Sequence, residues 1–312
     1  MLIMDGSNIL HRCKYMSPAI DWKMYAFMCA RSILANVFEF KDDDATVVWD
    51  LSGSYRRKRA YPEYKERPKL DKNTPEGRKE VMELEAYIKA RDWLHANLPR
   101  MSIRSIQEKG IEADDIAYWL IMEKFPSQNI GLEKTNYFCT SDLDWCQFIT
   151  EYWWWYNPMK RVKDENGVSI SASKEEKIFD YKDFIETYGT RKRFVMRKAL
   201  LGDTSDNIPK SYLMGEKNVD KYVDKLLNKE NIVDDSAVSK YLQEFVRSGQ
   251  LTKNLELIMF GLLGRSERKR LHISYDESNK KVSKPVLVDW IAMGAEIDST
   301  QFLAFGDYLN FT

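Results

Sequence analysis

The first half of the chain alternates between short apolar runs and longer segments with helical periodicity. Runs of roughly four to six apolar, β-branched or aromatic residues are typical of buried strands in a parallel sheet, whereas longer segments with apolar side chains three and four apart are typical of helices. Because helices separate the strands, the pattern predicts an α/β fold with a mostly parallel sheet flanked by helices. The predicted strands are 1–4, 45–49, 102–107 and 137–140, and the predicted long helices are 21–40 and 74–98.

The second half of the chain has a different pattern. A run of tyrosine and tryptophan at 152–156 predicts one more strand, whose rings are expected to pack in the core and at the sheet edge rather than to stack on bases. From about Tyr181 the chain predicts helices without strands. We therefore expect two domains, an α/β domain at 1–183 and an all-helical C-terminal domain at 184–312. The helices predicted in the second domain are 191–201, 220–227, 237–248 and 254–263, followed by a packed element at 285–312.

Composition narrows the class of protein. An apolar content of 44% predicts a globular chain, and equal numbers of basic and acidic residues (48 each) argue against a uniformly basic surface without excluding segregated charge. No apolar stretch reaches membrane-spanning length, and Asp5 interrupts the apolar start, so no signal peptide is expected. The cysteines lack metal-type spacing, which predicts a reduced, cytoplasmic interior. They are Cys13, Cys29, Cys139 and Cys146.

Acidic residues follow the predicted strands at their carboxyl ends. Asp5, Asp50 and Asp142 stand one or two residues beyond a strand, the first of them in a predicted polar turn at 5–8. In an open parallel sheet functional groups collect at this edge, and clustered carboxylates repel unless they are protonated or bind cations. Mg²⁺ or Mn²⁺ suits oxygen ligands, while His11 is the only nearby histidine, so zinc is not expected.

Two further acidic groups accompany these strand-end residues. Glu112, Asp114 and Asp115 open a predicted helix, on which Glu112 and Asp115 share a face. Asp203 and Asp206 flank a Thr-Ser pair in a turn after the basic helix at 191–201. Carboxylates also stabilise helix N-termini through the first N–H groups and the dipole, so simple helix capping remains an alternative for both groups.

A basic segment lies between Asp50 and Glu112. From Tyr55 to Lys72 eight basic residues face three acidic ones, a net charge of +5, and three tyrosines are interleaved with them. Positive charge for phosphates together with aromatic faces for bases favours contact with a single-stranded nucleic acid, and a solvated loop is the alternative. A second basic patch at 265–270 is expected to be a solvated surface.

These motifs together resemble the 5′-nuclease superfamily, which contains flap endonucleases, the 5′-exonuclease domain of bacterial DNA polymerase I and phage 5′-exonucleases. Six motifs occur in the family's order over nearly the whole chain. They are Met-Asp-Gly-Ser-Asn at 4–8 with Arg12 downstream, Trp-Asp at 49–50, Tyr-Lys at 64–65, Glu-Ala-Asp-Asp at 112–115, Ser-Asp-Leu-Asp at 141–144 and Gly-Asp-Thr-Ser-Asp-Asn-Ile-Pro at 202–209. The compact size and the turn at 156–160 are most similar to the T-even-type bacteriophage ribonucleases H, which act in primer removal.

The resemblance implies a PIN-like sheet, a helical arch at about 52–100 through or under which a 5′ strand passes, and a helix-hairpin-helix-like duplex-binding motif in the C-terminal domain. It also implies a structure-specific 5′-3′ exonuclease and flap endonuclease that hydrolyses DNA, and RNA in RNA–DNA duplexes, with two Mg²⁺ ions about 4 Å apart or with Mn²⁺ in their place. The implied ligands of the first ion are Asp5, Asp50, Glu112, Asp114 and Asp115, and those of the second are Asp142, Asp144, Asp203 and Asp206.

The resemblance also assigns basic residues. Lys65 matches an arch lysine that contacts the scissile phosphate, and Arg12 matches a phosphate-binding arginine; with Asp142 they are the predicted catalytic residues. The family usually continues after Asn-Ile-Pro with a glycine-rich hairpin that grips duplex, often with a monovalent cation. Here 210–217 contains one glycine, so a K⁺ site is not predicted. The predicted nucleic-acid contacts are Arg56, Arg57, Arg59, Tyr64, Lys65, Arg67, Gly215 and Lys217.

Two other functions compete with this hypothesis. A single-strand ribonuclease of the PIN type shares the acidic α/β core, but the motif at 202–207 and the helical second half argue against it. A non-catalytic protein that binds branched DNA should lack acids from some motif, and none is missing. The expected partners are DNA with a 5′ flap, nick or end, RNA–DNA duplex, and a single-strand-binding protein or sliding clamp. A monomer is expected, in the host cytoplasm if a phage encodes it.

Overall fold

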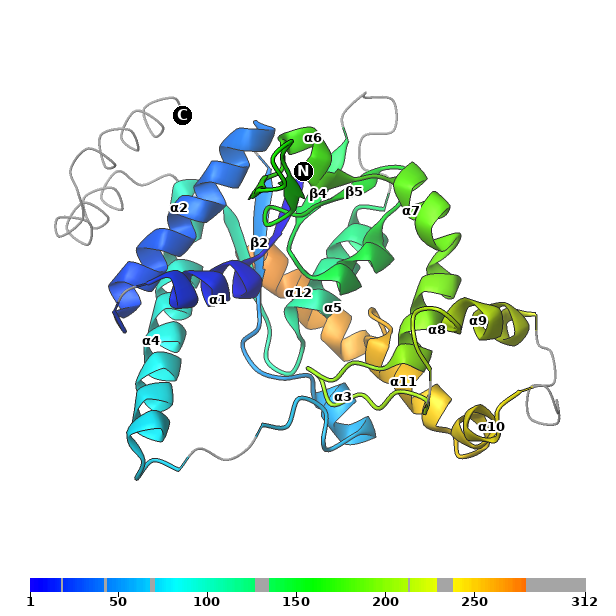
Figure 1. Ribbon diagram of the computed structural model, residues 1–312. Coiled ribbons are helices and arrows are strands. Elements are labelled where there is room, and N and C mark those ends of the chain that lie inside the picture. The colour runs from blue at the N-terminus through cyan, green and yellow to red at the C-terminus, as the bar shows by residue number, and fades with distance from the viewer. Residues whose placement is uncertain are drawn as a thin grey trace. The chain divides into compact units, whose positions relative to one another are not determined.

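The computed structural model describes residues 1–17, 19–41, 44–67, 71–126, 135–212, 214–228 and 238–278 (Figure 1). The chain divides into two compact units. Unit 1 comprises Met1–Trp49, Lys69–Gln107 and Arg270–Thr312, and unit 2 comprises Asp50–Pro68 and Glu108–Lys269. The units interleave along the chain, and the predicted division after residue 183 stays a prediction. The element predicted at 285–312 lies outside the described residues.

Unit 1 contains three parallel strands in the order β3-β2-β1. Leu2 lies opposite Ala45 in the register, and Thr46 lies opposite Arg104. The first two strands are buried along their whole length, as their continuous apolar sequence predicts for a sheet covered on both faces. The three predicted strands are confirmed as β1 (Leu2–Asp5), β2 (Ala45–Trp49) and β3 (Arg104–Gln107).

Three long helices of unit 1 pack on one another and on these strands. The helices predicted at 21–40 and 74–98 are confirmed. The helix predicted at 74–98 begins as expected, with the Thr74 hydroxyl accepting from Gly77 N (3.0 Å) and Pro75 in the first turn. The helices are α1 (Gly6–Met16), α2 (Trp22–Phe40) and α4 (Pro75–Asn97), the last followed by the 3₁₀ turn η1 (Leu98–Met101).

The polar turn predicted at 5–8 is wrong, because α1 begins directly after β1. The Asp5 carboxylate accepts from Asn8 N (2.9 Å) and so caps this helix. Gly6 lets the helix start close to β2, since a Cβ there would lie 2.6 Å from Val47 Cγ1. The polar residues after β1 therefore form the capped first turn of α1 and not a separate turn.

Unit 2 contains the remaining strands of the mostly parallel sheet. β4 pairs in parallel with β5, and β5 pairs antiparallel with β8. Trp153 and Tyr156 of β5 are buried, which confirms core packing for the aromatic run. The strands are β4 (Asn136–Cys139), β5 (Trp153–Tyr156) and β8 (Ile178–Phe179).

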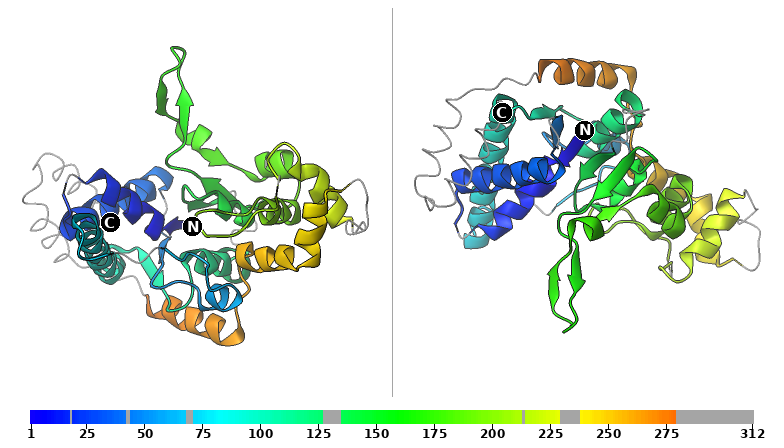
Figure 2. Two further views of the ribbon diagram at one scale, coloured as in Figure 1. Left: turned by 60° about the horizontal axis from the view of Figure 1, so that its bottom comes forward. Right: turned by 90° about the horizontal axis from the view of Figure 1, so that it is seen from above.

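A two-stranded hairpin, β6 (Arg161–Lys163) with β7 (Ser169–Ser171), projects from unit 2 in both views of Figure 2. Gly167 adopts a φ of 75° in its turn, as the Asn-Gly pair there predicts. Val168 and Ile170 on the hairpin are exposed. The polar segment after the aromatic strand is therefore a hairpin.

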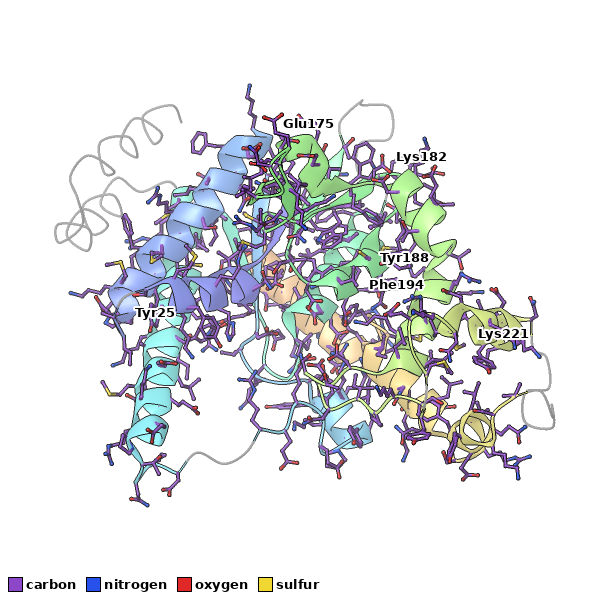
Figure 3. The ribbon with its side chains drawn as sticks, viewed as in Figure 1. Tyr25, Glu175, Lys182, Tyr188, Phe194 and Lys221 are labelled. Carbon is purple, nitrogen blue, oxygen red and sulfur yellow. The ribbon has the colours of Figure 1, made fainter. Side chains whose placement is uncertain are left out.

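Helices form the rest of unit 2 and pack around an aromatic core. Phe148 lies 5.3 Å from Trp145 and 5.4 Å from Phe260, measured between ring centroids. Tyr188 and Phe194 join two successive helices at a centroid distance of 4.8 Å (Figure 3). The helices are α3 (Tyr55–Ala60), α5 (Ala113–Tyr118), η2 (Trp119–Lys124, a π-helix), η3 (Leu143–Phe148, a 3₁₀ helix), α6 (Lys174–Lys177), α7 (Tyr181–Tyr188), α8 (Arg191–Leu201), α9 (Val219–Leu227), α10 (Lys240–Arg247) and α11 (Gln250–Ile258).

The last described helix, α12 (Arg265–Glu277), begins in unit 2 and continues into unit 1. The helix predicted at 254–263 is α11, which ends at Ile258 instead. Gly261 has a φ of 76°, and backbone groups at 259–261 bind side chains of the site described below. Among the described residues no helix is long and apolar enough to cross a membrane, and all four cysteines are buried free thiols.

Candidate functional site

A pocket of about 110 Å³ in unit 2 gathers five carboxylates from three segments of the chain. Asp114 comes from α5, Asp142 and Asp144 from the start of η3, and Asp203 and Asp206 from the loop after α8. The remaining lining residues are Tyr64, Lys65, Ser205, Ile208, Leu257, Ile258 and Phe260.

Hydrogen bonds of the backbone and of an indole orient these carboxylates. Asp142 stands three residues beyond β4, where the sequence predicted an acid, and its Oδ1 accepts from Asp144 N (2.8 Å). Trp145 Nε1 donates to Asp114 Oδ1 (2.7 Å). Asp50 follows β2 and accepts from Ala113 N (2.8 Å), so it caps α5. Asp50 therefore stabilises the N-terminus of α5.

The loop after α8 forms a closed turn that presents Asp203 and Asp206. Asp203 N donates to Ile208 O (2.9 Å), and Ile208 N donates back to Asp203 O (2.7 Å). The Asp203 carboxylate also accepts from the backbone N of Ser205 (2.8 Å) and from its hydroxyl (2.6 Å). The Asp203 carboxylate thus stabilises its own loop and also lines the pocket.

Replacing Gly202 with alanine should disturb this loop. Gly202 has a φ of 67°, and a Cβ there would lie 2.5 Å from Ile208 O and 2.6 Å from Lys210 N. We expect Gly202→Ala to lower the free energy of unfolding by roughly 1–3 kcal/mol, measured by urea denaturation, because both the dihedral and the contacts are unfavourable. Gly53→Ala is the control, since nothing lies within 4 Å of its Cβ. Equal stability of the two variants would contradict this description of the loop.

Two lysines offset part of the negative charge. Lys198 on α8 forms an ion pair with Asp144 and lies 3.9 Å from Asp203. Lys65 Nζ lies 3.3 Å from Glu112 Oε1 and 3.7 Å from Asp206 Oδ2. Five carboxylates against two ammonium groups leave an excess of negative charge around the pocket.

This charge arrangement changes the proton affinity of the groups. Burial raises the pKa of Asp142 and of Asp206 above its usual value, although the neighbouring lysines oppose the shift. Burial also lowers the pKa of Lys198, whereas Glu112 and other carboxylates outweigh burial at Lys65 and raise its pKa. Around Glu112, Lys65 and Arg57 outweigh burial and lower the pKa of that carboxyl.

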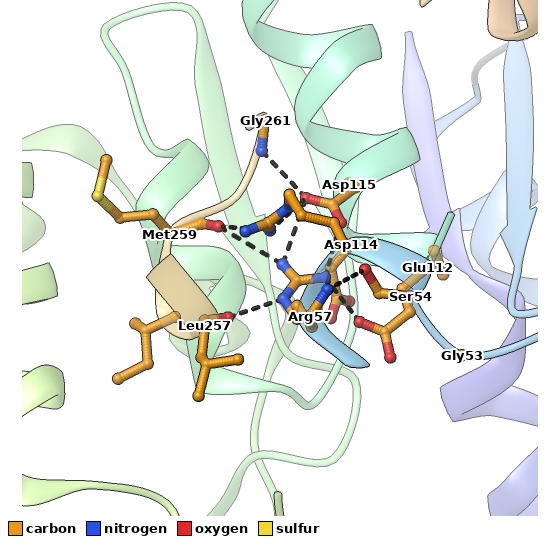
Figure 4. A network of polar contacts seen from close by, with 12 residues as sticks. Gly53, Ser54, Arg57, Glu112, Asp114, Asp115, Leu257, Met259 and Gly261 are labelled. Carbon is orange, nitrogen blue, oxygen red and sulfur yellow. Dashed lines mark hydrogen bonds and ion pairs between the residues drawn. The ribbon is translucent and has the colours of Figure 1, made fainter. Parts of the chain in front are cut away.

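Arg57 connects the basic helix α3 to the acidic helix start (Figure 4). Its Nη1 lies 2.6 Å from Glu112 Oε2 and 2.6 Å from Asp115 Oδ2, so these two acids share a helix face, as predicted. Arg57 Nε donates to Leu257 O (2.7 Å), and Gly261 N donates to Asp115 Oδ1 (3.0 Å). One guanidinium therefore joins α3, α5 and the last turn of α11.

The placement of Arg57 weighs against the prediction that it contacts nucleic acid. Its residue surface is 1% exposed, and its guanidinium is committed to protein acceptors. Arg56 likewise donates to Glu256 O and Met259 O. Arg59 and Arg67 are exposed and remain candidates for contact with nucleic acid. The tyrosine of the Tyr-Lys motif, Tyr64, is 3% exposed, so its ring is packed inside the unit instead of being offered to a base.

The donor set of the pocket suits a divalent cation such as Mg²⁺ or Mn²⁺, because it consists of carboxylate oxygens with excess negative charge. In the described part of the chain, however, no three His, Cys, Asp or Glu side chains are arranged to hold an ion. Lys198 lies against Asp144, and Arg57 occupies Glu112 and Asp115. The pairing of Asp115 with Arg57 and Gly261 N weighs against its predicted role as a ligand.

Asp5, Arg12, Gly215 and Lys217 are predicted site residues that are not among the lining residues of this pocket. Asp5 and Arg12 belong to unit 1, and their roles stay predictions. Gly215 and Lys217 lie before α9 in unit 2, where Gly215 N donates to Asn218 Oδ1 (2.9 Å) and Lys217 is exposed. Neither belongs to the described lining of the pocket, and their contact with duplex also stays a prediction.

Sequence reasoning missed Lys198 and Asn207. Lys198 lies in the predicted basic helix five residues before Asp203, and its position next to the motif was the available signal. Asn207 lies within the motif itself, and its side chain binds the turn that carries Lys65, as described below. Both contacts join residues that are distant in sequence, which periodicity does not predict.

Comparison with known proteins finds relatives that match most of this chain. A DNA polymerase I of Caldicellulosiruptor bescii is 27% identical over 277 residues, covering 84% of this chain and 29% of the relative. A 5′-3′ exonuclease of Aquifex aeolicus is 24% identical over 297 residues, covering 92% of this chain and 88% of the relative. The chain thus spans about a third of the length of the DNA polymerase I relatives it matches.

Solved structures show the same fold. The T5 D15 protein, crystallised with metal ions, has a TM-score of 0.65 at 19% identity, covering 89% of this chain and 98% of that chain. The bacteriophage T5 D15 flap endonuclease in a complex with DNA and metal ions has a TM-score of 0.63 at 18% identity, with the same coverage. The family model described as "5′-3′ exonuclease, N-terminal resolvase-like domain" matches residues 1–189, more than half of the chain. This chain therefore belongs to that 5′-3′ exonuclease family of nucleases.

Proposed function

We propose that this protein is a divalent-metal-dependent 5′-3′ exonuclease and flap endonuclease that hydrolyses DNA, and RNA paired with DNA, at 5′ ends, nicks and flaps. The observation that carries the proposal is the pocket lined by five carboxylates and by Lys65, whose Nζ lies 3.7 Å from Asp206 Oδ2. Membership of the 5′-3′ exonuclease family supports it, as do the T5 D15 structures with metal ions and with DNA.

The residues of the pocket suggest how phosphodiester hydrolysis would be divided among them. Mg²⁺ held by Asp114, Asp142, Asp144, Asp203 and Asp206 would supply an activated water and a positive charge for the leaving oxygen. Lys65 places an ammonium group at the pocket, where it would neutralise charge on the phosphate that is attacked. Contacts of this kind are made to phosphates, so cleavage should depend on salt and on the shape of the junction much more than on base sequence.

Cleavage of labelled substrates tests the proposal. Purified protein with Mg²⁺ or Mn²⁺ should cut 5′-labelled flap DNA, nicked duplex and an RNA–DNA duplex, and EDTA should stop the reaction. In competition, flap DNA should be cut in preference to unstructured RNA, which a PIN-type ribonuclease would prefer. Intact flap and nicked DNA under these conditions would refute the proposed activity.

Replacing Lys65 with alanine should slow single-turnover cleavage of flap DNA by about 10²–10³-fold, because a preorganised positive charge at the phosphate is lost. Binding of the same DNA, measured by fluorescence anisotropy with Ca²⁺ in place of Mg²⁺, should weaken much less. Lys182→Ala removes an exposed lysine of α7 and is the control (Figure 3). If Lys65→Ala cleaved at the control's rate, the assigned role of Lys65 would be wrong.

We further propose a role in removing RNA primers during phage DNA replication, in the host cytoplasm, as a monomer. This role is supported by the resemblance of the six motifs to the T-even-type ribonucleases H. A single-strand-binding protein or sliding clamp of the replisome is the expected protein partner. Cleavage of a nicked duplex that carries a 5′ RNA segment, compared with an all-DNA nick, tests this narrower proposal.

A further inference from the structure

The turn that carries Lys65 is attached to the Asp203–Ile208 loop by one side chain. Asn207 Nδ2 donates to Glu63 O (2.9 Å) and to Glu66 O (2.8 Å), one carbonyl on either side of Lys65. The backbone adds a third bond, from Lys65 N to Asp206 O (3.0 Å). Two segments about 140 residues apart in sequence are thus joined by three hydrogen bonds.

The Asp203–Ile208 loop is held in place by hydrogen bonds to α11, so it can support the turn that carries Lys65. Asn254 on α11 is buried, and its Nδ2 donates to Ala199 O (2.8 Å) and Pro209 O (2.6 Å). The paired bonds between Asp203 and Ile208 close the loop at its base. Asn207 therefore projects from a rigid turn, and the Glu63–Glu66 turn is the element that it holds in place.

Lys65 depends on such support because its backbone is strained. Its φ of 50° is unusual for a residue with a long side chain, and such a conformation persists only where the surroundings enforce it. In this conformation Nζ reaches the pocket, at 3.3 Å from Glu112 Oε1. Relaxation of Lys65 to a negative φ would redirect the side chain and move its ammonium group.

A simpler explanation is that asparagine occurs at 207 only because it tolerates a left-handed conformation, here with a φ of 59°. Asparagine in such turns commonly bonds its own neighbouring backbone. At Asn207 both amide N–H groups instead donate to carbonyls of a distant segment. The local explanation accounts for the dihedral angle but not for these two bonds.

We propose that Asn207 is a positioning residue, whose side-chain amide clamps the Glu63–Glu66 turn and thereby holds the Lys65 ammonium group at the acidic pocket. The inference rests on the proposed function for its effect on cleavage, and on the contacts of Asn207 alone for its effect on the turn. It couples the Asp203–Asp206 loop, which supplies carboxylates, to the turn that supplies the positive charge.

Asn207→Gly and Asn207→Asp test the clamp directly. Glycine keeps the left-handed dihedral and removes the amide, whereas aspartate keeps the shape but points oxygens at two carbonyls. Hydrogen exchange of peptides covering 61–67 should be at least about tenfold faster in both variants than in the wild type, because the turn opens more often. Asn166→Asp makes the same chemical change in the β6–β7 turn and should leave this exchange unchanged. Unaltered exchange in Asn207→Gly would overturn the proposal.

A double-variant cycle tests whether the clamp acts through Lys65. Asn207→Gly should slow single-turnover cleavage of flap DNA by about 10–100-fold, as losses of supporting residues do. In a Lys65→Ala background the same change should have less than about a threefold effect, because the group that it positions is absent. Equal losses in both backgrounds would overturn the positioning role. A wild type without cleavage would instead refute the proposed function, while the exchange measurement would still decide whether the clamp exists.

Discussion

Replacing Arg57 with methionine should lower the free energy of unfolding by about 3–5 kcal/mol, because it removes the guanidinium that the buried Glu112 and Asp115 share at 2.6 Å. Only the more distant Lys65, 3.3 Å from Glu112, and Arg56, 3.9 Å from Asp115, would remain as counter-charges. Arg57 is 1% exposed, and Glu112 and Asp115 are 2% and 1% exposed, so water cannot solvate the charges that remain. The guanidinium also lies 5.3 Å from the Phe260 ring, a contact that methionine only partly replaces. Urea denaturation followed by tryptophan fluorescence measures the loss.

Arg59→Met is a matched control for this prediction, because Arg59 lies on the same helix, two residues away, and is exposed. It should change the unfolding free energy by less than about 0.5 kcal/mol. Adding Asp115→Asn to Arg57→Met should recover part of the loss, since it removes one of the two buried carboxylates that lose the guanidinium. If Arg57→Met and Arg59→Met unfolded at the same urea concentration, the ion-paired network would have no stabilising role.

Replacing Asp142 with asparagine should abolish cleavage to within the detection limit, with a loss of at least about 10²–10³-fold, while DNA binding stays largely intact. Asp142 lines the pocket together with acids from two other segments, and its Oδ1 accepts from Asp144 N (2.8 Å). Asparagine can keep that hydrogen bond through its carbonyl oxygen but loses the negative charge. The change therefore removes charge from the pocket with little effect on local structure.

Single-turnover cleavage of flap DNA with Mg²⁺, together with anisotropy for binding, measures this effect. Glu186→Gln is the control, because it removes an exposed carboxylate of α7 in the same unit. The midpoint of urea unfolding of Asp142→Asn should stay close to that of the control. A variant that still cleaved at the wild-type rate would show that the Asp142 carboxylate is not needed for cleavage, and its predicted catalytic role would be wrong.

Local sequence patterns predicted the strands and several helix starts, for reasons visible in the structure. β2 has the predicted bounds, because five consecutive residues without turn formers are all buried. Thr74 and Pro75 begin α4 because their cap chemistry acts within one helical turn. Asp142 was predicted from its place after a strand, which follows from chain order, and it lines the pocket described above.

The basic segment shows where such patterns fail. Arg56, Arg57, Lys58 and Arg59 are equivalent by composition, and the sequence predicted three of them as contacts to nucleic acid. Helix α3 turns only Arg57 fully inward, where its carboxylate partners lie more than fifty residues away in the chain. Its third partner, the carbonyl of Leu257, is two hundred residues away. Composition cannot distinguish an exposed arginine from one that is buried by a distant partner.

By itself, the sequence determined the α/β class, the mostly parallel sheet and the set of acidic positions, because periodicity, capping and strand ends act over a few residues. Only the tertiary structure decided which charges neutralise which. Arg57 with Asp115 and Lys198 with Asp144 are pairings between distant segments. Their physical cause is burial, which makes an unpaired charge costly and so selects one partner among many of the same type.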